Sequence, residues 1–175
     1  CEKLGVARLS DLVYINEETW RTKEETRSEA LYIWQQIKEC IYKGVNKEGV
    51  LPGGLNVTRR AADFNRKLLG EDVIYKNINE WFAAVKNSPK DFNQITRWIS
   101  CFALAVNEEN ASFGRIITAP TNGASGVIPA VLMYSQTFTE FNTEEDIIRF
   151  ILVAGEIGTL FKKNATISAA MGGCQ

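Results

Sequence analysis

The stretch SPKDFNQITRWISCFALAVN, residues 88–107, carries the strongest helical signal in the sequence. Its large apolar residues recur in steps of three and four, the spacing of one face of an α-helix: Phe92, Ile95, Ile99, Phe102 and Val106. Ser88 followed by Pro89 is typical of an N-cap with proline at the first helical position. We therefore expect a helix from about residue 89 to about residue 107, with its apolar face in a core.

Similar periodicity precedes this stretch. Thr22 and Glu25 have the spacing of a capping box, and apolar residues follow every three or four positions as far as Gly44, which we expect to stop the helix. Pro52 and its neighbouring glycines predict a loop over 49–54. Shorter helices are expected over 56–69, ended by Gly70, and over 78–85.

After the central stretch, two more helices are expected. Pro129 is tolerated best near a helix start, so one helix should begin near Ile128, or earlier with a kink, and run to about Ser135. Thr143 should cap the other, whose residues 146–161 are apolar almost all round, and such a helix is normally buried. With no convincing pair of strands, the sequence predicts an all-α or mostly α fold with a central buried helix at 146–161.

Composition excludes several classes of protein. Of 175 residues, 45% are hydrophobic and 23% charged, and the net charge of -1 gives no basic surface for nucleic acid or an anionic membrane. The apolar run 147–160 is interrupted by Arg149, Gly155 and Glu156, whereas a membrane span needs about 20 mostly apolar residues. We expect a cytoplasmic protein that binds neither nucleic acid nor membrane.

The absence of histidine and the wide spacing of four cysteines limit the chemistry. Without His, the chain alone cannot build a Ser–His or Cys–His nucleophile or a His-ligated zinc site. Cys40 and Cys101 fall inside helical patterns and are expected to fill the core as reduced thiols. The sequence begins at Cys1 without Met and stops at Gln175 after Gly-Gly-Cys, so we expect a fragment of a longer protein.

Two stretches of small residues are the candidate functional segments. The first, TAPTNGASGVIPAVL at 118–132, places small polar residues ahead of a helix start, where unpaired N–H groups and the helix dipole favour an anion such as a carboxylate. A plain Asn-Gly turn is the alternative. The second, AAMGGCQ at 169–175, contains Cys174, either a ligand of a metal cluster or a structural thiol. Residues 164–170 fit a pocket wall or tight helix packing equally.

The segments SFGRIITAPTNGASGVIPAVL (112–132), GEIGTLFKKNATISAAMGGCQ (155–175) and LPGGLNVTRRAAD (51–63) resemble the catalytic domain of bacterial iron–sulfur L-serine dehydratases, also called L-serine ammonia-lyases. The resemblance covers nearly the whole chain and implies a lyase that converts L-serine to pyruvate and ammonia, in amino-acid degradation and gluconeogenesis. It also implies a [4Fe–4S] cluster held by three cysteines with one iron open to substrate.

By this resemblance, Cys174 is the first of the three cluster ligands. The loop Thr121, Asn122, Gly123 and Ala124 is similar to the family's substrate loop and is expected to hold the serine carboxylate or amine. The other two cluster cysteines and the family's N-terminal Ser-His-Thr motif are absent from residues 1–175. We therefore expect part of one helical catalytic domain, an incomplete ligand set, an inactive fragment, partnership with the enzyme's remaining domains, and a homo-oligomer.

Several assignments stay open at this point. No general base is evident, and Glu156 is the nearest carboxylate within the motifs. Arg59 and Arg60 fit either a carboxylate site or a solvated or interface face. A pyridoxal-phosphate lyase would need a Schiff-base lysine, for which only Lys162 and Lys163 lie in the motifs. The last alternative is a non-catalytic helical module that binds a partner.

Overall fold

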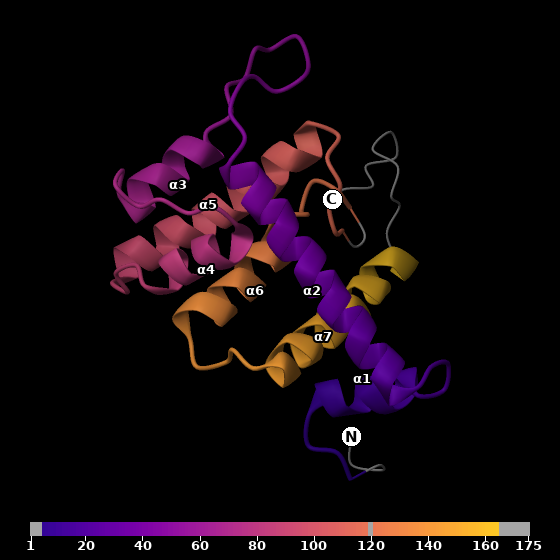
Figure 1. The fold of residues 1–175 in the computed structure, drawn as a ribbon. Helices are drawn as coiled ribbons and strands as arrows, with labels where there is room; N and C mark the ends of the chain where they lie inside the picture. The colour runs from indigo at the N-terminus through magenta and orange to yellow at the C-terminus, as the bar shows by residue number, and fades with distance from the viewer. Residues whose placement is uncertain (1–4, 119–120, 165–175) are drawn as a thin grey trace.

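The computed structural model describes residues 5–118 and 121–164, which contain seven α-helices and no strand (Figure 1). Within this part, the one β pairing is an isolated antiparallel bridge between Val50 and Thr58. The all-α prediction is confirmed. The helices are α1 (Leu9–Glu17), α2 (Lys23–Val45), α3 (Ala61–Leu69), α4 (Ile78–Lys86), α5 (Phe92–Ala111), α6 (Val127–Phe138) and α7 (Glu144–Asn164).

Helix α5 is the centre of the fold and packs against α2, α3 and α6 (Figure 1). Its inward face is closed to solvent, and the Trp98 ring stacks on Phe102 with centroids 5.4 Å apart. The predicted helix exists, but it begins later than Ser88–Pro89 indicated. Asp91 is the N-cap because its carboxylate accepts the N–H of Gln94 at 3.0 Å, and a carboxylate satisfies a free helix N–H well.

Gly44 sets the distance between α2 and α5 rather than ending α2. The helix continues to Val45, and Asn46 is its C-cap. A Cβ on Gly44 would lie 2.5 Å from the carbonyl oxygen of Ala105, closer than atoms can approach. The prediction that Gly44 stops the helix is therefore wrong: glycine is needed here for close helix packing.

The prediction that 146–161 forms the central buried helix is also wrong. Ile147 and Ile148 of α7 are buried, but Leu160 and Phe161 are 54% and 60% exposed. Helix α7 packs mainly on α1 and α2 through its first half, and its last turns extend beyond both helices (Figure 1). Among the described residues nothing covers its second half, so α5 takes the central position.

The helix expected over 56–69 begins only at Ala61, whereas the predicted starts of α2, α6 and α7 are confirmed at atomic level. Thr22 and Glu25 form a complete capping box, and Thr143 and Asp146 exchange the equivalent bonds at the start of α7. Pro129 lies in the first turn of α6, where its missing N–H costs nothing. None of the helices in the described residues is long and apolar enough to cross a bilayer.

Candidate functional site

The loop before α6 is a series of tight turns. The Thr118 hydroxyl donates to the carbonyl of Thr121 at 2.6 Å, and the N–H of Ser125 donates to the carbonyl of Asn122 at 3.1 Å. The N–H of Val127 donates to the carbonyl of Ala124 at 3.0 Å. Two of the N–H groups expected to receive an anion are thus bonded within the loop, so the turn interpretation holds for part of its backbone.

The loop lies against the C-terminal half of α5. The side-chain amide of Asn110 donates to the carbonyl of Asn122 at 3.2 Å. At the other end of the loop, a Cβ on Gly126 would lie 2.7 Å from the carbonyl oxygen of Ala103 and 2.9 Å from Oδ1 of Asn107. Gly126 is therefore required for the loop to approach α5, and the loop is anchored at both ends.

A cavity of about 210 Å³ opens beside the loop. Most known pockets for drug-sized ligands are larger, about 300–1,000 Å³, so this one suits a small molecule. Thr121 and Ala124 line it, whereas Asn122 and Gly123 are exposed beside it. The remaining wall comes from α2, the 117–118 segment, α6 and α7: Ile33, Ile37, Ile117, Thr118, Ser125, Ile128, Pro129, Ile151, Ala154 and Gly155.

The polar groups of this cavity are few. Thr118, Thr121 and Ser125 are the hydroxyl residues in an otherwise apolar wall. Ser125 is 5% exposed, and its hydroxyl has no hydrogen-bond partner among the described residues. Burying an unpaired hydroxyl costs about 1–3 kcal/mol, so the structure retains here a polar group that a bound molecule can satisfy.

A buried ion pair holds the end of α5 next to this loop. Arg59, whose side chain is 2% exposed, donates to Oε1 of Glu109 at 2.5 Å and to the Ser112 hydroxyl at 2.8 Å. It also donates from Nε to the carbonyl of Lys47 at 3.1 Å. The expectation of a solvated or interface face is therefore wrong for Arg59, because two acidic residues and two carbonyls compensate its charge inside the protein.

The neighbouring residues complete the buried cluster. The Glu108 carboxylate accepts the N–H of Arg60 at 2.7 Å and that of Ala61 at 3.3 Å, so it caps the start of α3. The Arg60 side chain itself is exposed. Glu108, Glu109 and Asn110 were not among the residues predicted from the sequence. The signal was available: a run of four polar residues, 107–110, continues the most strongly apolar helix of the chain.

Cys40 and Cys101 fill the core, as predicted. Both are free and buried, and burial raises the pKa of Cys40 to about 11 and that of Cys101 to about 12. Metal ligation requires the thiolate. These two thiols are protonated at neutral pH and lie in the apolar core, so neither suits an iron cluster.

The remaining candidate residues are either exposed or outside the described part of the chain. Cys1 and Cys174 lie outside the described residues, as does most of 164–170. In the described part of the chain, no three His, Cys, Asp or Glu side chains are grouped for a metal ion, so these residues do not form a cluster site. Glu156, Lys162 and Lys163 are exposed on α7.

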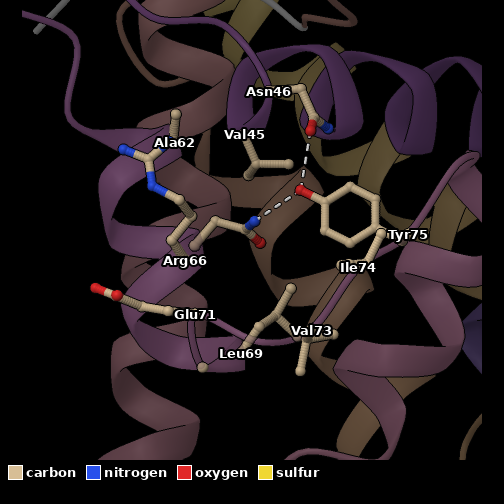
Figure 2. Close-up of a pocket in the computed structure, with 11 residues that line it drawn as sticks. Val45, Asn46, Ala62, Arg66, Leu69, Glu71, Val73, Ile74 and Tyr75 are labelled. Atoms are coloured by element: carbon tan, nitrogen blue, oxygen red, sulfur yellow. Dashed lines mark hydrogen bonds between the residues drawn. The ribbon is translucent and has the colours of Figure 1, made fainter.

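A second cavity, of about 300 Å³, lies beside α3 and the loop that leads to α4 (Figure 2). The Tyr75 hydroxyl donates to Oδ1 of Asn46 at 2.9 Å and accepts from Nδ2 of Asn65 at 3.0 Å. Oδ1 of Asn65 accepts in turn from the Trp81 indole at 2.9 Å. This network satisfies its own polar groups, which is typical of a structural contact rather than a ligand site.

The described residues form a helical domain with a small cavity at the start of a helix. Residues 6–175 match the family described as serine dehydratase alpha chain, and the chain belongs to this family. It is 46% identical to the L-serine dehydratase of Streptomyces coelicolor over 95% of this chain and 33% of that protein.

Two further relatives are also L-serine dehydratases. The chain is 45% identical to L-serine dehydratase TdcG of Escherichia coli, over 100% of this chain and 35% of the relative. It is 39% identical to the L-serine dehydratase of Helicobacter pylori, over 82% of this chain and 29% of the relative. The chain thus spans about a third of the length of the curated relatives it matches.

Proposed function

We propose that this chain is part of the helical catalytic domain of an iron–sulfur L-serine dehydratase, a cytoplasmic homo-oligomeric lyase. The enzyme removes water from L-serine, and the resulting aminoacrylate becomes an imine that hydrolyses to pyruvate and ammonia. The observation that carries the proposal is the small cavity beside the 121–124 loop, in a chain of the serine dehydratase family. The remaining domains and the other cluster ligands belong to the longer protein.

The loop and cavity support a role in binding and orienting serine. Thr121 and Ala124 line the cavity, and Asn122 and Gly123 lie at its edge, so together they can receive the carboxylate or amine of a small amino acid. Their contribution is proximity: holding a reactant in one orientation lowers the entropic part of the barrier. The isoleucines of α2 and α7 in the wall exclude water, which strengthens these polar contacts.

The cluster itself is proposed from the family. A [4Fe–4S] cluster with an open iron would supply a Lewis acid for the serine hydroxyl, a poor leaving group. Cys174 is the proposed ligand in this chain and acts as a ligand only. Because the described residues do not form the cluster site, the chain alone is expected to be inactive.

The decisive test is anaerobic reconstitution of the full-length protein carrying Cys174→Ser. Thiolates hold iron–sulfur clusters, so loss of one ligand should reduce both cluster content and serine deamination to background. Cys40→Ala is the control: it removes a buried thiol of the core and should leave iron content unchanged. A Cys174→Ser enzyme with wild-type iron content and activity would refute the proposal.

Two alternative functions predict different results for the reconstituted full-length protein. A pyridoxal-phosphate lyase would show an aldimine absorption band that is insensitive to oxygen, whereas iron–sulfur absorption is bleached by oxygen. The exposure of Lys162 and Lys163 at the end of α7 gives no support to a Schiff base. A non-catalytic binding module predicts no activity in the wild type and no effect of changing Asn122.

A further inference from the structure

We propose that Asn110 is a positioning residue for the 121–124 loop and that the Arg59–Glu109 ion pair fixes Asn110 in place. This inference rests on the proposed function for its kinetic consequence, because it is the substrate loop that Asn110 positions. That Asn110 holds the loop in position follows from the hydrogen bonds made by α5 and does not depend on the function.

The carbonyl of Asn122 is the point that Asn110 controls. It accepts two hydrogen bonds, from Nδ2 of Asn110 at 3.2 Å and from the N–H of Ser125 at 3.1 Å. Two donors fix the direction of a carbonyl. Because the peptide bond is planar and trans, they also fix the Gly123 N–H, which points the opposite way, away from α5. Asn110 thereby orients a backbone donor in the middle of the substrate loop.

The last turn of α5 would not by itself hold Asn110 rigidly, since helix ends fray. Arg59 prevents this by binding on both sides of Asn110. Its guanidinium donates to the Glu109 carboxylate at 2.5 Å, to the carbonyl of Glu108 at 3.4 Å and to the Ser112 hydroxyl at 2.8 Å. Removing either Arg59 or Glu109 would leave the other buried charge without this partner, so the arrangement is strongly fixed.

The other end of the loop is anchored independently. Gly126 lies against Ala103 and Asn107, one to two turns before Asn110 on the same helix. Packing fixes that end, whereas a single side-chain hydrogen bond joins the Asn122 end to α5. The Asn110 contact is exposed, so it can be removed without opening the core. This makes Asn110 the residue whose change alters loop position with little effect on folding.

The test uses the full-length enzyme, reconstituted anaerobically, with Asn110→Asp. The variant replaces the donating amide by an oxygen that repels the Asn122 carbonyl. We expect the KM for serine to rise about tenfold with kcat little changed, the size expected for losing one hydrogen bond and gaining a repulsion. Iron content and visible spectrum should be unaltered, and amide hydrogen exchange in peptides covering 121–126 should accelerate.

Matched variants separate positioning from general damage. Asn93→Asp, at the exposed start of the same helix, should change neither KM nor exchange. Asn110→Gln retains the donor and should recover part of the lost affinity. Arg59→Lys keeps the charge but loses the fork of donors, so it should accelerate exchange in 108–114 as well as in 121–126.

The outcomes are distinguishable. Wild-type KM and wild-type exchange in Asn110→Asp would overturn the inference. A wild-type enzyme that does not deaminate serine would refute the proposed function instead, and hydrogen exchange at 121–126 would still decide whether Asn110 positions the loop.

Discussion

At the scale of single residues, polar side chains stabilise the helix starts by accepting hydrogen bonds from free backbone N–H groups. Thr22 and Thr143 begin α2 and α7 by accepting the N–H group three residues later, at 3.2 Å in both cases. Glu108 performs the same task for α3 from a distant helix. Each bond satisfies an N–H that the helix itself leaves unpaired, and such caps typically contribute about 1 kcal/mol.

The cap of α7 predicts a pH dependence. Hydrogen bonds from the Thr143 hydroxyl and then its N–H lower the pKa of Asp146 below its ordinary value of 3.8. A carboxyl whose pKa is depressed on folding stabilises the protein above its unfolded pKa, and this stabilisation is lost as the pH falls through the folded pKa. Asp146→Asn should therefore lower the melting temperature at pH 6–7, and this deficit should shrink as the pH falls below 3.8. This is measured in thermal melts across that range.

The exposed Asp72, in the loop before α4, provides the control. Asp72→Asn should leave the melting temperature close to wild type at both ends of the pH range, because Asp72 caps no helix. An Asp146→Asn deficit that is equal at pH 3 and pH 7 would contradict a role for the charged carboxylate.

At the scale of the helices, close packing of α2 on α5 organises the domain. The crossing point is Gly44 against Ala105, where backbone meets backbone. Other faces of α5 contact the segment before α3 through the buried Arg59 and the loop before α6 through Gly126. The loop before α6 is therefore held against the central helix of the fold.

Gly44→Ala tests this packing. Alanine favours a helix over glycine by about 1 kcal/mol, but its Cβ would meet the carbonyl of Ala105 at 2.5 Å and force the helices apart. We expect the strain to dominate and the free energy of unfolding to fall by about 1–3 kcal/mol, measured by urea denaturation.

The same substitution at Gly155 of α7 is the control, since a Cβ there meets nothing within 4 Å. Gly155→Ala should leave stability unchanged or raise it by up to about 1 kcal/mol. Equal effects at the two glycines would mean that the α2–α5 crossing is not the constraint.

At the scale of the whole molecule, the cavity is assembled from segments far apart in the sequence. Ile33 and Ile37 of α2, the loop before α6, and Ile151 with Ala154 of α7 meet only after folding. An ion-pair network ties the same elements together, with Arg27 of α2 bonded to Glu145 of α7 at 2.6 Å. Because both partners are partly exposed, this pair contributes no more than about 1 kcal/mol, and apolar packing holds the cavity walls.

Filling the cavity should weaken substrate binding without weakening the fold. Ala154→Leu adds three carbons to the wall of a space of about 210 Å³. We expect the KM for serine in the full-length enzyme to rise at least about tenfold, the equivalent of about 1.4 kcal/mol of binding, while the melting temperature stays near wild type. Steady-state kinetics and thermal melts measure the two effects.

The control is Ala83→Leu, which adds the same bulk to an exposed position of α4 and should change neither quantity. If Ala154→Leu bound serine as tightly as the wild type, the cavity would not be the substrate site.

Much of the fold could be predicted from the sequence because its causes are local. Apolar spacing over 92–106 and the Thr22–Glu25 and Thr143–Asp146 caps act within one or two helical turns, so helix positions followed from them. Which helix is most deeply buried could not be predicted from these local patterns. Apolar residues lie almost all round α7 over 147–161, yet α5 is the central helix, because burial depends on which other helices are adjacent.

The candidate site was likewise predictable only where its causes are local. The sequence by itself determined that small residues at 121–126 precede a helix, and that Cys40 and Cys101 are core thiols. Only the tertiary structure decided that Arg59 is buried against Glu109, that Asn110 bonds to the loop, and which helices close the cavity. These contacts join residues 12 to more than 100 positions apart in the chain, and no local periodicity carries information about such separations.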